Sequence, residues 1–209
     1  MKKIMFNDRY GLTQAVLEGK KTMTRRIIKK EFEDIKAYHA NGGWHFIVDT
    51  DEWDSVELKP QYEIGERVAI AQSYKQCWDI YQKQWESYND LSSWRTPDAT
   101  LGDSVQETAG WTNKMFVKAE YMPHRIRITG IKVERLQDIT EQECICEGIK
   151  IKKGNRNGER PFGEFTFDGW DDYSFTAREA FAALIDKIRG NGTWNNNPLV
   201  FAYEFELTH

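Results

Sequence analysis

Hydrophobic residues recur with helical spacing in two stretches of the chain. Between residues 12 and 17 the apolar side chains share one side of a predicted helix, and Gly19 is placed to end it. The second predicted helix begins at Thr176, which forms a capping box with Glu179, and it ends at Gly190. Its apolar stripe consists of Ala180, Phe181, Leu184, Ile185 and Ile188.

Other hydrophobic residues form short β-prone runs or alternate with polar residues, as they do in strands. The run from Trp44 to Val48 is of this kind, and residues 56–58 are predicted to pair with it as a hairpin. Four further strands are predicted, at residues 67–73, 114–121, 125–136 and 198–207.

A short helix is predicted after the strand that ends at residue 136. Thr140 and Glu143 have the form of a capping box, and Gly148 can end the helix. Glu147 falls in its last turn, where a negative charge is unfavourable by roughly 0.3–1 kcal/mol because of the helix dipole. This placement indicates a compensating role for the Glu147 carboxylate.

Two stretches break the pattern of helices and strands. Residues 76–110 scatter tryptophans among polar residues without a sustained period, and residues 150–173 are rich in Gly, Asn, Arg and Asp. We interpret both as insertions into a single domain that spans residues 1–209. The tryptophans of the first insertion indicate that it packs against other parts of the protein and is not a free linker.

The composition is typical of a globular protein with a packed core. Of the 209 residues, 40% are hydrophobic and 13% are aromatic. The formal charge of −4 argues against a protein that coats nucleic acid through bulk charge, so a site for a polyanion has to be a local patch. Neither a secretion signal nor a membrane span is recognisable, and the three cysteines lack a C-x-x-C pair. We therefore expect a cytoplasmic protein with reduced thiols, no metal site and no cofactor.

Four basic residues fall within seven positions after the first helix, from Lys20 to Arg26. Residues 19–26, GKKTMTRR, resemble the G-x-K-x-x-x-x-R signature of ASCH domains. Residues 62–68 resemble the turn and strand that follow it in that family, and residues 131–149 match a third family block. Residues 197–205 look like the closing strand of phage and prophage members. These segments occur in the family's order and together cover about half of the chain.

The resemblance to ASCH domains implies an α+β fold, a small PUA-like β-barrel with flanking helices, here carrying the two insertions. It also implies a nucleoside or RNA as the partner, because the PUA-like superfamily is associated with RNA and modified nucleosides. The family includes a bacterial amidohydrolase that removes the acetyl group from N4-acetylcytidine with a lysine, a threonine and a glutamate. Carried over to this sequence, these catalytic residues are Lys21, Thr24 and Glu147.

The chemistry of amide hydrolysis gives this trio a physical rationale. Thr24 offers a hydroxyl nucleophile, and Lys21 acts as its base only if burial lowers the pKa of the lysine toward neutrality. Glu147 then orients the lysine or passes a proton to the leaving nitrogen. Residues 21 and 24 point to opposite faces of a regular strand, so they converge only if the segment turns or starts irregularly. The alternative to a catalytic role is that Lys21 belongs to a solvent-exposed basic loop and that Thr24 is simply a residue with high β propensity next to it.

Arginines near this segment and on the strand at 125–136 predict a nucleic-acid-binding patch. Arg125 and Arg127 share one strand face, and together with Arg25 and Arg26 they are predicted to contact phosphates. The alternative is that these arginines lie on a solvent-exposed strand face without a ligand.

Three functions stay open for this chain. They are amide hydrolysis of a nucleoside or RNA, a non-catalytic RNA-binding module and a ribonuclease. The ribonuclease is ranked last, because no His pair or carboxylate cluster stands out for phosphodiester cleavage.

Overall fold

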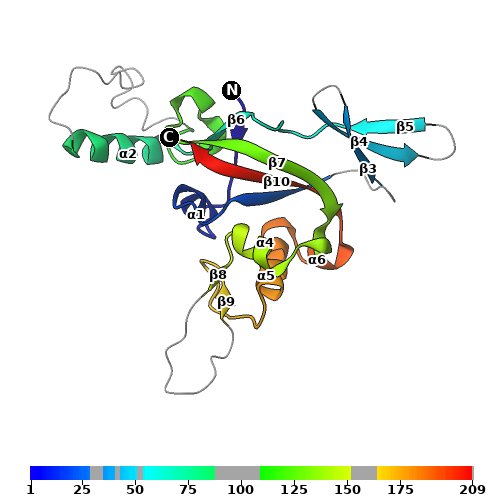
Figure 1. Ribbon diagram of the computed structural model, residues 1–209. Coiled ribbons are helices and arrows are strands. Elements are labelled where there is room, and N and C mark those ends of the chain that lie inside the picture. Colours follow the sequence, from blue (N-terminus) through cyan, green and yellow to red (C-terminus); the bar gives the residue numbers. More distant parts are fainter. Residues whose placement is uncertain (29–34, 41–42, 51–53, 88–108, 152–163, 209) are drawn as a thin grey trace. The chain divides into compact units, whose positions relative to one another are not determined.

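The computed structural model describes residues 1–28, 35–40, 43–50, 54–87, 109–151 and 164–208 (Figure 1). The chain divides into two compact units. Unit 1 comprises Met1–Phe6, Arg67–Ile126 and Thr208–His209, and unit 2 comprises Asn7–Glu66 and Arg127–Leu207. The single domain over residues 1–209 stays a prediction.

The largest sheet has five strands in the order β1-β6-β7-β10-β2. They are β1 (Lys3–Ile4), β2 (Met23–Ile27), β6 (Arg67–Ile70), β7 (Arg125–Arg135) and β10 (Leu199–Thr208). The sheet is mixed, because β1 runs parallel to β6 whereas β10 runs antiparallel to β2. The register of the second pair sets Tyr203 opposite Thr24. In Figure 1, β10 (red) lies between β7 (green) and β2 (blue).

The predicted PUA-like barrel is wrong, because this sheet is open. Among the described strands, β1 and β2 form its two edges and do not pair with each other. The β-prone stretch between residues 35 and 58 does not extend the sheet. It forms a separate antiparallel sheet from β3 (Ile35–Ala40), β4 (Gly43–Thr50) and β5 (Asp54–Leu58). Strands that are close in sequence tend to pair with one another, as β3, β4 and β5 do here. Their pairing occupies backbone N–H and C=O groups that would otherwise be available to the strands of a barrel.

The predicted hairpin between residues 44–48 and 56–58 is confirmed, with Val48 opposite Val56. Strand β3, which pairs with the other side of β4, was not predicted. The third sheet pairs β8 (Lys150–Ile151) with β9 (Phe165–Thr166), and both strands lie within the second predicted insertion. The residues between them, 152–163, lie outside the described part of the chain.

Unit 1 differs from the sequence prediction at two places. The strand predicted over 114–121 is wrong: two short 3-10 helices, Lys114–Phe116 and Ala119–Tyr121, occupy this stretch. Their turns bring backbone oxygens toward Lys3, whose Nζ lies 2.6 Å from the oxygen of Met115 and 2.8 Å from that of Val117. The first predicted insertion overlaps helix α2 (Tyr74–Ser87), and its residues 88–108 lie outside the described chain.

The helices of unit 2 largely follow the pattern of the sequence. They are α1 (Leu12–Leu17), α4 (Glu141–Cys146), α5 (Ala177–Arg189) and α6 (Thr193–Asn196). Both predicted capping boxes are present, at Thr140 and at Thr176, and α4 packs against α5. The first five residues of β10 are all buried. The buried rings of Tyr62 and Tyr203 meet edge to face, with 5.3 Å between their centroids.

Within the described residues, none of the helices has the length and apolar character needed to cross a lipid bilayer.

Candidate functional site

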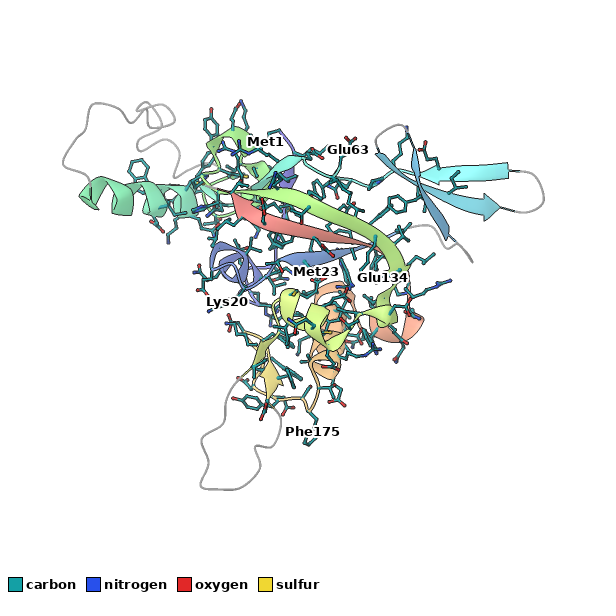
Figure 2. All side chains as sticks on the ribbon, in the orientation of Figure 1. Met1, Lys20, Met23, Glu63, Glu134 and Phe175 are labelled. Atoms are coloured by element: carbon teal, nitrogen blue, oxygen red, sulfur yellow. The ribbon has the colours of Figure 1, made fainter. Side chains whose placement is uncertain are left out.

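An irregular turn between α1 and β2 positions Lys21. Gly19 has a φ of 68°, and the backbone N–H groups of Lys20 and Lys21 both donate to the carbonyl oxygen of Ala15 at 2.9 Å. The regular strand begins only at Met23, and Figure 2 labels Lys20 within the turn and Met23 at the start of the strand. Lys21 thus precedes the strand that carries Thr24. This is the irregular start that convergence of residues 21 and 24 requires.

Lys21 and Glu147 form a buried ion pair. The Lys21 Nζ lies 2.6 Å from Oε2 of Glu147 and 2.7 Å from its backbone oxygen. Both residues are buried, with exposed fractions of 2% and 4%. Glu147 caps the C-terminus of α4, and Gly148 follows with a φ of 104°. This positive φ favours glycine, and a Cβ atom at position 148 would lie 3.1 Å from Cδ2 of Leu12, whereas its distance of 3.6 Å from Cδ of Lys21 is an ordinary contact.

Burial lowers the pKa of Lys21 below its ordinary value of 10.5. The charge and hydrogen bond of Glu147 act in the opposite direction, because they favour the protonated lysine. The positive charges of Arg26 and Arg25 add to the lowering. Lys21 is therefore a lysine whose proton is held less tightly than in water, which is the property expected of a base.

Thr24 is buried on β2, with an exposed fraction of 5%. Antiparallel pairing sets it opposite Tyr203, so the two side chains share one face of the sheet. Among the described residues, its hydroxyl group makes no hydrogen bond. The structure thus joins Lys21 to Glu147 directly, whereas it does not link Thr24 to either of them through a hydrogen bond. The Thr24 hydroxyl is left uncommitted to any described protein acceptor.

Arg25 is surrounded by carboxylates. Its Nη2 lies 2.6 Å from Oε1 of Glu134 and 3.0 Å from Oε2 of Glu143, and its Nη1 lies 3.1 Å from Oε1 of Glu147. The Arg25 side chain has an exposed fraction of only 1%. Lys132 neutralises the outer part of this network through contacts with Glu134 and Glu143. The two additional glutamates come from the end of β7, where Figure 2 labels Glu134, and from the first turn of α4.

The sequence prediction missed Glu134 and Glu143. The sequence did indicate that Arg25 has different neighbours from Thr24 and Arg26, because alternation along a strand places residue 25 on the opposite face. Glu143 was identified only as a helix cap, and it does accept from the backbone N–H of Thr140 at 2.9 Å. Its second role as a partner of Arg25 depends on a residue that is 118 positions away.

Arg26 is half-buried on the same face of β2 as Thr24. Burial lowers its pKa, and the nearby Tyr62, Glu147 and Tyr203 act in the opposite direction. Burial also raises the pKa of Tyr62 to about 12, so this tyrosine stays protonated at neutral pH. Arg26 therefore places a positive charge on the face of β2 that also carries Thr24.

The other predicted phosphate-binding arginines lie on β7. Arg127 is exposed, and its Nη2 lies 2.5 Å from Oε1 of Glu206. Arg125 is half-buried and belongs to unit 1, whereas Arg25, Arg26 and Arg127 belong to unit 2. The guanidinium groups of Arg25 and Arg127 thus both face carboxylates, which reduces the positive charge that they offer to a phosphate.

No group of His, Cys, Asp and Glu side chains suited to a metal ion occurs in the described parts of the chain. The clustered carboxylates of Glu134, Glu143 and Glu147 face the cations of Lys21, Arg25 and Lys132 instead. Cys77, Cys144 and Cys146 are free thiols.

Comparison with known proteins returned no matching family model, no matching curated protein and no matching solved structure. The similarity to ASCH domains therefore rests on the motifs in the sequence and stays a prediction.

Proposed function

We propose that this protein hydrolyses the amide bond of an acylated nucleoside, with N4-acetylcytidine as the substrate that the ASCH-like motif indicates. The observation that carries this proposal is the buried pair of Lys21 and Glu147, with 2.6 Å between Nζ and Oε2. The pair lies at the irregular start of the strand that carries Thr24. A lysine with a lowered pKa, a fixed carboxylate and an uncommitted hydroxyl are the groups that hydrolysis by a threonine nucleophile needs.

In the proposed reaction, the neutral amine of Lys21 removes the proton from the hydroxyl of Thr24. The Thr24 oxygen attacks the amide carbon, and the C–N bond breaks as the Lys21 ammonium returns its proton to the leaving nitrogen. This step leaves an ester on Thr24 and releases cytidine. A water molecule, deprotonated by Lys21, then attacks the ester carbon. The bond from this carbon to the Thr24 oxygen breaks, Lys21 returns the proton to that oxygen, and acetic acid leaves and ionises to acetate. Glu147 holds the Lys21 amine in place through both steps.

Arg26 is the group best placed to face the oxyanion that develops in each attack. It lies two residues after Thr24 on the same face of β2, and burial keeps water away from much of its side chain. A positive charge in such a partly dry environment stabilises a developing negative charge more strongly than it would in water.

The contacts of the arginines favour hydrolysis over the RNA-binding module. A binding module needs arginines whose charge is available to phosphates. Arg25 is instead buried among three carboxylates, and Arg127 is paired with Glu206. A phosphate would have to displace these carboxylates before it could bind Arg25 or Arg127, which argues against RNA binding through these two arginines.

Thr24→Ala is expected to abolish turnover of N4-acetylcytidine, whereas Thr24→Ser keeps a measurable part of it because serine retains the nucleophilic hydroxyl. Steady-state kinetics of the three proteins test this order. Rapid quenching followed by peptide mass spectrometry should also find an acetyl group on Thr24 in the wild type and none in Thr24→Ala. Equal turnover by Thr24→Ala and the wild type would exclude Thr24 as the nucleophile.

A further inference from the structure

The network around Arg25 contains three cations and three carboxylates among the described residues. Lys21, Arg25 and Lys132 provide the positive charges, and Glu134, Glu143 and Glu147 provide the negative ones. Its formal charges therefore cancel. Such cancellation makes burial of charged groups tolerable, provided that their geometry is good and their hydrogen bonds are satisfied.

The two oxygens of Glu147 have different partners. Oε2 lies 2.6 Å from the Lys21 Nζ, and Oε1 lies 3.1 Å from Nη1 of Arg25. A carboxylate that is held on one oxygen alone can still turn about its terminal bond. With both oxygens held by different cations, the plane of the Glu147 carboxylate is fixed, and so is the direction from which it contacts Lys21.

Arg25 is itself held from the other side. Its Nε donates to Oε1 of Glu134 at 2.9 Å, and its Nη2 donates to Oε2 of Glu143 at 3.0 Å. Nη2 also lies 2.6 Å from Oε1 of Glu134, within ion-pair distance. The planar guanidinium can make all these contacts at once because its N–H groups diverge in a fixed fork. A lysine ammonium carries the same charge but lacks this fork.

From this geometry we propose that Arg25 is a positioning residue, which orients the Glu147 carboxylate toward Lys21 and is itself held in place by Glu134 and Glu143. This inference rests on the proposed function, because it assigns Arg25 a part in placing the catalytic base. Arg25 lies at a variable position of the ASCH-like signature, between Thr24 and Arg26. It acts through Glu147 and does not touch the reacting atoms.

The test compares Arg25→Lys with Arg178→Lys. Arg178 is a structural control in the same unit: its guanidinium donates to the backbone oxygens of Gln137 and Ile139 and has no contact with the network. With N4-acetylcytidine as substrate, Arg25→Lys should lose kcat on the order of 100-fold at nearly constant KM, the size of effect that misplacement of a catalytic group by about 1 Å produces. Arg178→Lys should change neither constant.

A second readout does not depend on activity. Brief labelling with acetic anhydride, followed by mass spectrometry, compares the acetylation of Lys21 with that of the exposed Lys118 in the same sample. Labelling of Lys21 should rise several-fold in Arg25→Lys and stay at the wild-type level in Arg178→Lys.

The two readouts separate the two proposals. If wild-type protein shows no turnover but Lys21 becomes reactive only in Arg25→Lys, the positioning role holds and the proposed substrate is wrong. If Arg25→Lys keeps wild-type labelling and wild-type kcat, or if Arg178→Lys raises the labelling of Lys21 equally, the positioning role is overturned.

Discussion

Lys21→Met is expected to lower kcat/KM for N4-acetylcytidine by roughly 10²–10⁴-fold, the usual contribution of a general base. Methionine is close to lysine in length and has no basic nitrogen, so it removes the base while filling the buried space beside Gly148. Lys20→Met is the matched control, because the neighbouring Lys20 side chain is 67% exposed and, in the described part of the chain, forms its ion pair with the surface residue Glu18. It should keep wild-type kinetics.

The pH dependence gives this prediction a second readout. Burial lowers the pKa of Lys21, so in the wild type kcat/KM should rise with pH through a midpoint below 10.5, as the lysine loses its proton. This rise should be absent from the residual activity of Lys21→Met. A rise with the same midpoint in Lys21→Met would assign the base to another residue, and the account of the site would then be wrong.

Glu147→Gln is expected to lower the free energy of unfolding by about 3–5 kcal/mol at pH 7, the usual cost of removing one partner from a buried ion pair. Glu147 faces two buried cations, Lys21 and Arg25, and glutamine cannot neutralise either of them. Urea denaturation of both proteins measures the difference. Glu206→Gln on β10 is the matched control, because Glu206 pairs with Arg127 on the exposed surface, and its loss should change stability by less than about 1 kcal/mol.

The stability defect of Glu147→Gln should shrink as the pH rises. Glu147 favours the protonated form of Lys21, so its removal lowers the pKa of this lysine further in the folded state. Between the folded pKa and the unfolded value near 10.4, the unfolded chain binds more protons than the folded chain, and the free energy of unfolding rises with pH. Because the folded pKa is lower in Glu147→Gln than in the wild type, this rise begins at a lower pH in the variant, and the difference in stability becomes smaller. A defect that is small at pH 7, or one that grows between pH 7 and pH 9.5, would contradict a buried Lys21–Glu147 pair.

Local signals in the sequence predicted the helices and several strands of this protein. The capping boxes at Thr140 and Thr176 lie where short-range hydrogen bonding requires them, and the end of α1 near Gly19 follows from the left-handed conformation that glycine adopts readily. The hairpin of β4 and β5 was predictable for the same reason, because its partners are close in sequence.

The barrel was predicted wrongly because closure is a long-range property. The motifs of residues 19–26 and 197–205 do fall on two paired strands, β2 and β10, but pairing between these strands says nothing about the free edge of β2. The two 3-10 helices near Val117 were missed because the β propensity of this stretch is a local property, whereas its backbone carbonyl groups accept hydrogen bonds from a distant residue, Lys3. These hydrogen bonds take the place of those that a neighbouring strand would provide.

The candidate site was only partly predictable. The pairing of Lys21 with Glu147 spans 126 positions and came from the motif, not from any local pattern. The motif did not indicate the partners of Arg25, because a run of basic residues does not reveal which of them turns inward. Strand alternation separates Arg25 from Arg26, but only the fold brings the carboxylates of Glu134 and Glu143 to the inner one.

Amide hydrolysis by the buried Lys21–Glu147 pair is tested by incubating wild-type protein with N4-acetylcytidine and quantifying cytidine and acetate by chromatography. We expect equal amounts of both products, formed at a rate that is proportional to the protein concentration and that is lost in Lys21→Met. Absence of both products with folded wild-type protein, over times long compared with ordinary turnover, would contradict the claim.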